Sequence, residues 1–210
     1  MSNSTSDMDG DFSILDSLPD EHKREVIRLV ELFAESEQKL KSHEQTANEV
    51  YIPAINELRY ASHHFLQEYL RKGDLNGVVK AQNHCNRAIL DVIEAAAYFY
   101  LEQIRLFQED YRNITVVDIY PAYLESVKRI DKVREIIKSI PLGEGHNRDH
   151  AYLKELENGV IDLRDIASDL SYARIELNKK MRQDWRNNFY ALVMLIITIT
   201  ATIAAVLALK

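Results

Sequence analysis

The feature that most constrains this sequence is an uncharged stretch near its C-terminal end. Residues 189–209 read FYALVMLIITITATIAAVLAL, which is 21 residues without a charged side chain. As an α-helix this stretch would be roughly 31 Å long, which matches the hydrocarbon thickness of a bilayer. It has no polar face, unlike the surface helix of a soluble protein. We therefore expect a transmembrane helix over 189–209.

The residues that flank this stretch predict its orientation. Basic side chains precede it and a single one follows it, at Lys179, Lys180, Arg182 and Arg186 before the span and at Lys210 after it. Because cytoplasmic flanks of membrane helices are enriched in Lys and Arg, we expect residues 1–188 in the cytoplasm and the span in the inner membrane. Trp185 and Tyr190 lie where an interfacial aromatic belt is expected.

The remainder of the sequence has an ordinary globular composition. Apolar residues make up 46% of the chain and charged residues 28%, and the formal net charge is −7. This balance argues against a protein that coats nucleic acid. The single cysteine, Cys85, excludes a disulfide framework and a cysteine-rich zinc module.

Helical spacing of apolar residues predicts an all-α protein. Residues 1–16 are expected to be a disordered acidic tail, and residues 17–188 a cytoplasmic bundle of four to five helices. Ser17, Pro53 and Pro121 are placed to open helices, and Gly73 to end one, with Asp74 capping the next. The expected helices cover 17–50, 53–72, 75–112, 121–140 and 149–209, with 114–120 as an extended connector and 141–149 as a loop.

Apolar stripes on two of the expected helices follow from the same spacing. The stripe of the first helix comprises Val26, Ile27, Val30, Phe33, Leu40 and Ala47. That of the fourth comprises Leu124, Val127, Ile130, Val133, Ile137 and Ile140.

Leucines recur every seven residues just before the span. They are Leu156, Leu163, Leu170 and Leu177, with Arg174 interrupting the complementary positions of the heptad. Such a seam is typical of helix–helix packing. It predicts either packing inside the chain's own bundle or a coiled-coil-like stalk over 150–188 that associates between subunits.

Polar residues gather on the second and third expected helices. In an antiparallel hairpin turning at residues 73 and 74, residues whose numbers sum to about 147 lie level, so His63 is expected opposite His84. The candidate site residues at this height are Arg59, His63, His64, Asn83, His84 and Arg87.

Several chemistries could use such a cluster. Arginines and protonatable histidines suit an anionic ligand such as a nucleotide or a short oligonucleotide. Metal binding by His63, His64, His84 and Cys85 is disfavoured, since neighbours on a helix point about 100° apart. The plain alternative is that these polar groups bond to one another or to solvent. No cofactor is expected.

Arg59 and His64 have the R-x4-H spacing of HEPN-type ribonucleases, helical proteins that this chain resembles in class. That resemblance implies a histidine that handles the proton of the RNA 2′-hydroxyl and an arginine that contacts phosphate. On a straight helix His63 is better aligned with Arg59 than His64 is.

A second resemblance involves two longer blocks, IPAINELRYASHH at 52–64 and KAQNHCNRAILDVIE at 80–94. With the C-terminal span added, the architecture resembles small membrane effectors of antiphage defence, including those paired with nucleotidyltransferases in Hailong-like systems. That resemblance implies an oligomeric channel or permeabilising effector, gated by a nucleotide or short DNA that a partner enzyme encoded nearby would make.

Small and hydroxylated residues within the span bear on this hypothesis. Thr198 and Thr202 share one face, whereas Thr200 points elsewhere, and such residues let membrane helices approach closely. Because one span cannot enclose a pore, a pore would require a homo-oligomer. We therefore expect a membrane effector that is not an enzyme, with a membrane-tethered ribonuclease and a membrane-anchored scaffold as the alternatives.

Overall fold

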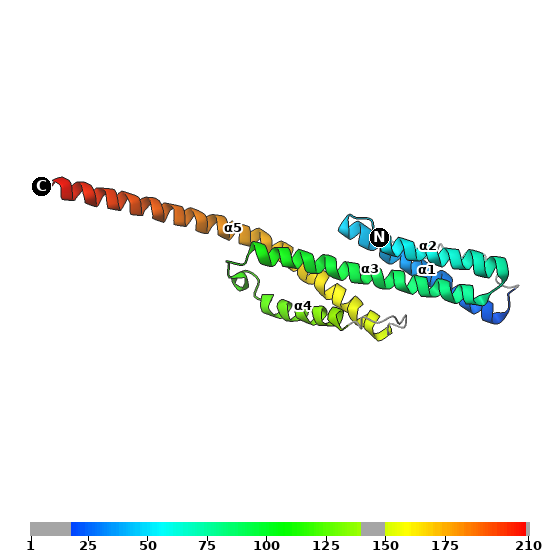
Figure 1. Cartoon of the computed structure of the whole chain (residues 1–210). Coiled ribbons are helices and arrows are strands. Elements are labelled where there is room, and N and C mark those ends of the chain that lie inside the picture. The colour runs from blue at the N-terminus through cyan, green and yellow to red at the C-terminus, as the bar shows by residue number, and fades with distance from the viewer. Residues whose placement is uncertain (1–17, 140–149, 209–210) are drawn as a thin grey trace, which may run out of the picture. The chain divides into compact units, whose positions relative to one another are not determined.

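A series of α-helices makes up the described part of the chain. The computed structural model describes residues 18–139 and 150–208. The helices are α1 (Asp20–Ala47), α2 (Ile52–His64), α3 (Leu75–Asp110), α4 (Tyr123–Lys138) and α5 (His150–Ala208), with a π-helix η2 (Phe65–Leu70) and a 3₁₀ helix η3 (Val116–Asp118) (Figure 1). No strand occurs in these ranges, so the predicted all-α fold is confirmed.

The chain divides into two compact units. The first comprises Met1–Phe99 with Ile136–Val160, and the second comprises Tyr100–Glu135 with Ile161–Lys210. The helices α3, α4 and α5 therefore contribute residues to both units. The expected acidic tail and the loop after α4 lie outside the described residues.

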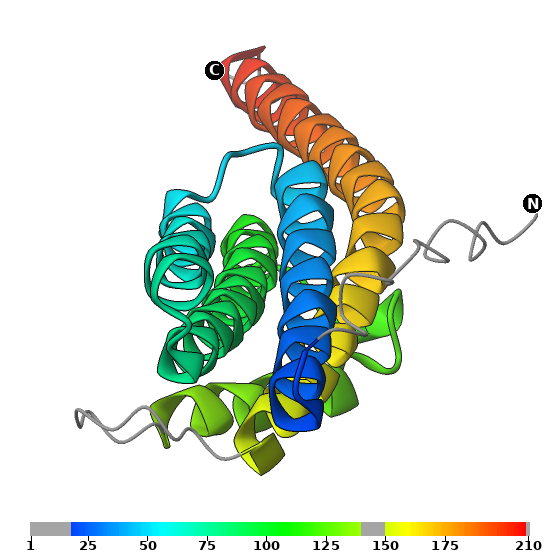
Figure 2. The same ribbon diagram turned by 90° about the vertical axis from the view of Figure 1, so that its right-hand side faces the viewer.

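The core of the first unit lies where α1, α2 and the first part of α3 run side by side (Figure 2). Its buried residues are Val26, Leu29 and Leu40 of α1, Ala54, Leu58 and Ala61 of α2, Tyr69 of η2, and Val78, Ala81, Cys85, Ala88 and Val92 of α3. The alanines of α2 and those of α3 are each seven residues apart, so each pair lies on one side of its helix. Small side chains in these rows allow the helices to pack closely.

The first helix differs from its expected form in two ways. It begins at Asp20 with Pro19 at the N-cap, and Ser17 lies outside the described residues. Ile27 and Val30 of the expected apolar stripe are 36% and 38% exposed, so the stripe is buried only in part. The side of α1 that faces the core instead carries Val26 and Leu29, both of which are buried.

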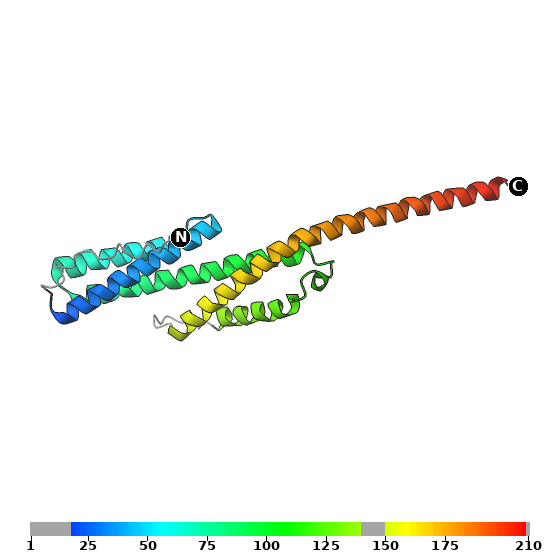
Figure 3. The same cartoon turned by 180° about the vertical axis from the view of Figure 1, so that it is seen from behind.

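The core of the second unit is built from the end of α3, from α4 and from α5. Figure 3 shows α4 running alongside α5, and the side chains of Arg129 and Asp162 join the two helices in an ion pair. The buried apolar residues are Ile104 and Phe107 of α3, Tyr111 directly after it, Val116, Ile130 and Val133, and Leu163, Ile166, Leu170, Ala173 and Leu177 of α5.

The arginine that interrupts the heptad has a defined place in this unit. The Arg174 guanidinium lies 5.9 Å and 5.7 Å from the ring centroids of Phe107 and Tyr111, and it pairs with Asp110 at 2.8 Å. The Tyr111 hydroxyl in turn donates to Oδ1 of Asn178 at 2.8 Å. Arg174 therefore covers an aromatic pair rather than breaking the helix seam.

Three features of the second unit differ from what the sequence suggested. The fourth helix begins at Tyr123 rather than at Pro121, and Leu124 is 63% exposed because it lies in the first turn of α4 on the outer side. The connector is not wholly extended: Val116 is buried by the 3₁₀ turn of η3, after the extended Thr115.

The four heptad leucines are all at most 2% exposed within this single chain. This burial favours packing inside the bundle over a stalk formed between subunits. Beyond Leu177 the same helix continues without a break to Ala208. Of residues 181–204, all are exposed except Val193, which is half-buried.

Candidate functional site

Two histidines meet where α2 ends and α3 passes it. The rings of His64 and His84 stack with centroids 5.1 Å apart and planes 14° apart. His63 is exposed and meets His64 edge-on at 5.8 Å. The register is within one residue of the expected one, but the ring that faces α3 belongs to His64 and not to His63. Neighbouring side chains on a helix point about 100° apart, so only one of the two can face the partner helix.

Each stacked histidine is held by a carboxylate. Nδ1 of His84 lies 2.7 Å from Oε2 of Glu57, and Nδ1 of His64 lies 2.9 Å from Oε1 of Glu68. An ionised carboxylate only accepts hydrogen bonds, so in both pairs the imidazole Nδ1–H is the donor. We call the two histidines and the two glutamates the His–Glu cluster.

Two further cations complete this cluster. The Lys80 ammonium donates to Oε2 of Glu68 at 2.8 Å, and the Arg87 guanidinium lies 3.9 Å from Oε2 of Glu57. The hydrogen bond from Lys80, followed by that from His64, lowers the pKa of Glu68 below its usual value. Each carboxylate therefore carries two cationic or protonatable partners. The Nε of Arg87 is buried and has no hydrogen-bond partner among the described residues.

The π-helix and a glycine bring this cluster together. A Cβ placed on Gly77 of α3 would lie 2.7 Å from Cβ of Glu68, 2.9 Å from the amide nitrogen of Tyr69 and 3.0 Å from the carbonyl oxygen of His64. No side chain fits this gap, since two of these neighbours are backbone atoms. The wide turn of η2 and the start of α3 are thus in direct contact, which sets Glu68 beside Lys80.

The hairpin turn is built as its sequence predicts. Gly73 has a φ of 72°, and its N–H bonds to the carbonyl of Tyr69 at 2.8 Å. The Asp74 N–H reaches the carbonyl of Glu68 at 3.1 Å, and the Asp74 carboxylate accepts from the N–H of Asn76 at 3.0 Å. These bonds satisfy the end of one helix and the start of the next.

The other candidate residues of the hairpin lie outside this network. Asn83 is on the exposed side of α3. Arg59 is exposed too, with its guanidinium 5.5 Å from the centre of the Tyr60 ring. The Tyr60 ring lies 5.6 Å from that of His84, so Arg59 is connected to the histidines through an aromatic side chain. Of the six predicted residues, His64, His84 and Arg87 come together around Glu57 and Glu68.

Sequence reasoning missed Glu57, Glu68 and Lys80. One signal was available: His64 and Glu68 are four residues apart, a spacing that places side chains together on a helix. The pairing of Glu57 with His84 crosses between helices and depends on their rotation, which spacing does not give.

This geometry limits the chemistry of the cluster. A phosphate would compete with the Glu57 and Glu68 carboxylates for the same donors. A general base at His64 would have to work with its Nδ1 already bonded to Glu68, while Arg59 lies over Tyr60. Within residues 18–139 and 150–208, no three His, Cys, Asp or Glu side chains are grouped to hold a metal ion. The arrangement favours mutual satisfaction of polar groups in the hairpin.

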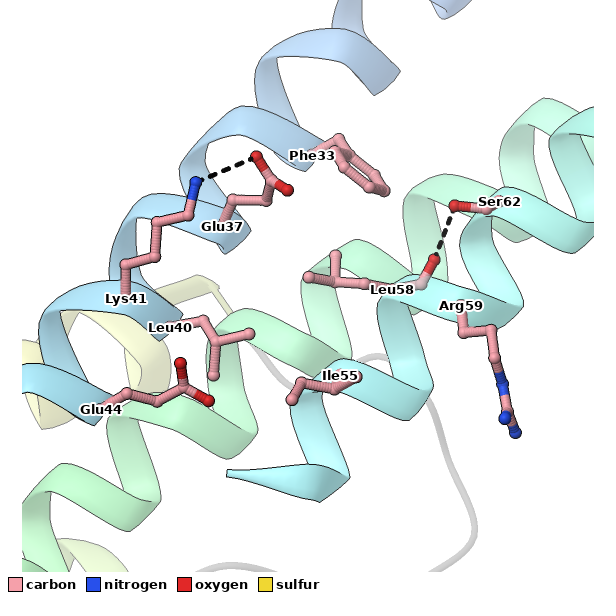
Figure 4. A pocket seen from close by; sticks show the side chains of 9 residues that line it. All are labelled: Phe33, Glu37, Leu40, Lys41, Glu44, Ile55, Leu58, Arg59 and Ser62. Carbon is pink, nitrogen blue, oxygen red and sulfur yellow. Dashed lines mark hydrogen bonds and ion pairs between the residues drawn. The ribbon is translucent and has the colours of Figure 1, made fainter. Parts of the chain in front are cut away.

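A groove of about 300 Å³ lies between α1 and α2 in the same unit. Figure 4 shows its apolar floor, formed by Phe33, Leu40, Ile55 and Leu58, with Arg59 turned away from it. The rim carries both signs of charge, including a Lys41–Glu37 pair at 3.7 Å. A rim of mixed sign selects no particular charged ligand.

The cysteine of the first unit is deeply enclosed. Cys85 is 0% exposed, and burial raises the pKa of its thiol to about 12. The Ser36 hydroxyl packs against it and bonds to its carbonyl at 3.1 Å. Because the thiolate is the reactive form, Cys85 is protected from alkylation while this core is closed.

The predicted membrane residues lie on the exposed end of α5. Within the described ranges one helix is long and apolar enough to cross a membrane: the 54-residue segment Ala151–Ala204 contains an 18-residue window of mean hydropathy 1.6, none of which is buried. Trp185 is 72% exposed and stacks on Phe189 at 5.7 Å, and Tyr190 is 59% exposed.

The threonines of this end bond to their own helix. The hydroxyl of Thr198 donates to the carbonyl of Met194 and that of Thr202 to the carbonyl of Thr198, each at 2.8 Å. Thr200 reaches the carbonyls of Ile196 and Ile197. Hydroxyls satisfied in this way are tolerated in an apolar environment.

No protein-family model, curated protein or solved structure matches the chain.

Proposed function

We propose that this protein is a single-pass membrane effector: a cytoplasmic helical body anchored in the inner membrane by the end of α5, acting as a homo-oligomer. The observation that carries the proposal is the change along α5 itself. From Leu156 to Leu177 every seventh residue is buried, whereas between Met181 and Ala204 the same continuous helix exposes every side chain except that of Val193, which is half-buried.

The exposed apolar surface needs an environment other than water. Large aliphatic side chains between positions 192 and 203 are 50% to 61% exposed, namely Leu192, Met194, Leu195, Ile196, Ile197, Ile199 and Ile203. Burying one such side chain fully is worth about 1.5–3 kcal/mol. Apolar patches of this extent are rare on soluble monomers, and a bilayer accommodates all faces of the helix at once.

The homo-oligomer rests on the span's own chemistry. Alanines and threonines give it a face of small side chains at Thr198, Ala201 and Thr202. Small residues allow membrane helices to pack closely. An ion channel or permeabilising pore would require several such spans, because each chain supplies one.

The ligand that would trigger the effector is the part of the proposal that rests on the resemblance. A nucleotide or oligonucleotide would bind at the hairpin through the side chains of His84 and Arg87. Its phosphate would have to displace Glu57 from both of them. A nucleotidyltransferase encoded nearby would be the partner enzyme that supplies it.

The anchor is tested by fractionation of the full-length chain and of a chain lacking 189–210. We expect the full-length protein to stay in the membrane through alkaline carbonate extraction and the shortened one to be released. In a Cys85→Ala background, an impermeant maleimide should label Lys210→Cys in intact cells and not Asn3→Cys. Release of the full-length protein by carbonate would refute the proposal.

The oligomer is tested by oxidative cross-linking in the same background. Thr198→Cys and Thr202→Cys should form disulfide-linked dimers in membranes, whereas Thr200→Cys, on another face of the helix, is the matched control. Equal cross-linking at all three positions would indicate random collision, and none at any position would indicate that the spans stay apart. Dye release from liposomes by the full-length chain then separates a pore from an anchor.

A further inference from the structure

Three basic residues form a stripe along α5 just before its apolar end. We call Lys179, Arg182 and Arg186 the basic stripe. Their spacings of three and four residues put them on one face of the helix. Asp184, the acidic residue between Arg182 and Arg186 in sequence, lies roughly 160° around the helix from the centre of that face.

The charges of this stripe are largely not neutralised by the chain. Arg182 and Arg186 are exposed, and neither has an ion pair among the described residues. Lys179 lies 3.6 Å from Glu176 but its side chain is 76% exposed. By contrast Lys180, one position further round the helix, donates to Asp118 at 2.9 Å.

The stripe is bordered by neutral polar groups and leads into the apolar segment. Together with Ile175, Asn178 and Gln183, it lines a shallow groove of about 640 Å³ along α5. Arg186 is three residues before Phe189, and Arg182 is seven, which is about 4.5 Å and 10.5 Å along the axis. Tyr190 follows one turn after Arg186 on the same face. When 189–209 spans the hydrocarbon, the height of Arg186 corresponds to the polar headgroup layer, and the long side chain of Arg182 extends toward that layer from the aqueous side.

We propose that the basic stripe binds the phosphodiesters of anionic phospholipids. Guanidinium groups pair with phosphate oxygens through two parallel hydrogen bonds, and amide side chains such as Gln183 add neutral donors. Because the charges occupy one face, the site also fixes how α5 is rotated about its own axis at the membrane surface. This inference rests on the proposed membrane span, and it adds the class of lipid that the span selects.

The single tryptophan, Trp185, lies within this stretch of α5 and serves as the probe. The full-length protein is reconstituted in mixed phosphatidylcholine and phosphatidylglycerol bilayers, in which one lipid at a time carries brominated acyl chains that quench tryptophan. Each basic charge near a membrane surface is worth roughly a fivefold preference for anionic lipid. We therefore expect brominated phosphatidylglycerol to quench more strongly than its share of the bilayer predicts, and we expect K179Q/R182Q/R186Q to lose this preference.

The control removes the same charge elsewhere. In K128Q/K132Q/K138Q the substituted lysines are exposed on α4, so the preference should stay unchanged. If that variant loses the preference equally, net charge and not the stripe is responsible, and the inference is overturned. The inference also fails if inorganic phosphate abolishes the preference where sodium chloride of equal ionic strength does not, since the site would then bind soluble phosphate.

Failure of the inference is distinguishable from failure of the proposed function. Equal quenching by both brominated lipids in the wild type would overturn the lipid site while leaving the span in place. Absence of quenching by either lipid would show that Trp185 is not at a membrane, which would overturn both.

Discussion

The His–Glu cluster and the apolar end of α5 differ in what they leave unsatisfied. In the cluster, two imidazoles stack on each other and each donates to a carboxylate that has a second cationic partner. At the end of α5, aliphatic side chains are half exposed and the polar hydroxyls bond to their own helix. The imidazole–carboxylate pairs of the first region form within the chain, and the second region requires surroundings that the chain does not supply.

Because of this difference, the apolar residues of α5 say more about function than the histidines and arginines of the hairpin do. Histidines and arginines draw attention because they can do chemistry, but here most of them are engaged with glutamates of the same hairpin. Leucines and isoleucines do no chemistry, but their exposure beyond Met181 is the observation on which the proposed membrane anchor rests. The comparison predicts that equal changes in the two regions have unequal effects.

The largest difference is expected for an arginine introduced at equally exposed aliphatic positions. Ile199 is 50% exposed at the middle of the apolar end, and Leu66 is 53% exposed in η2. Ile199→Arg should disfavour membrane insertion by about 2.5–3.5 kcal/mol, because the charge would lie in hydrocarbon. Leu66→Arg, which faces water, should change stability by less than about 0.5 kcal/mol. The share of protein resistant to carbonate extraction measures the first, and urea unfolding the second.

If both substitutions leave extraction and unfolding unchanged, the apolar end of α5 does not lie in a membrane. If Leu66→Arg destabilises as much as a core substitution, the π-helix has a partner that this chain does not show. Either result removes the contrast between the two regions.

Much of the fold could be predicted, because helix signals are local. The hairpin turn at Gly73 and Asp74, the length of α3 and the uninterrupted α5 all follow from residue types and spacing. Exposure was predicted less well. Ile27 and Val30 lie on the outer side of α1, since the choice between two overlapping apolar stripes depends on which neighbours the helix meets.

The site was harder to predict than the fold. The height of His64 and His84 in the hairpin follows from counting residues back from the turn. The pairing of His64 with Glu68 has a signal in their spacing of four residues, whereas the pairing of His84 with Glu57 depends on helix rotation, which spacing does not give. The contact at Gly77 is likewise invisible in sequence, because glycine in a helix usually indicates only flexibility.

The next largest effect is expected where η2 touches α3. Gly77→Ala would place a methyl group 2.7–3.0 Å from atoms of His64, Glu68 and Tyr69 on the other arm of the helical hairpin. Since backbone atoms cannot rotate away, we expect a loss of about 1–3 kcal/mol in the free energy of unfolding of the first unit. Alkylation of Cys85 at increasing urea concentration measures this, because that thiol is enclosed in the same core.

Asn76→Ala is the matched control, because it also introduces an alanine, at the preceding position of α3, where the side chain is exposed. It should leave the urea dependence of alkylation nearly unchanged. Equal stability of Gly77→Ala and the wild type would mean that the two segments separate readily, and the His–Glu cluster would then not be closed.

A smaller effect is expected from removing one carboxylate of the cluster. Glu57→Gln keeps the shape of the side chain but removes the charge that faces His84 and Arg87, and we expect a loss of about 1–2 kcal/mol. Glu37→Gln on α1 is the control, because Glu37 pairs with the exposed Lys41 at 3.7 Å and such surface pairs contribute about 0–1 kcal/mol. Cys85 alkylation in urea again provides the measurement, and indistinguishable losses in the two variants would count against a cluster that holds the hairpin together.

The smallest effect concerns acid. Lys80 and His64 hold the pKa of Glu68 below its usual value, so Glu68 binds its proton more weakly in the folded protein than in the unfolded chain. Its contribution to stability is therefore present above the unfolded value, about 4.5, and is lost as the pH falls through the lower folded value. The urea midpoint measured by circular dichroism should decrease in this range.

Lys80→Gln removes the main cause of this pKa shift, so its urea midpoint should decrease less between neutral pH and acid than that of the wild type. Lys41→Gln removes a cation from an exposed pair on α1 and should retain the wild-type acid dependence. If Lys80→Gln has the same acid dependence as the wild type, Glu68 is not held by Lys80 in solution. The Glu68 carboxylate would then be free to bind another partner. Only the pair of Glu57 and His84 would remain as polar groups that the chain satisfies by itself, in contrast to the apolar end of α5.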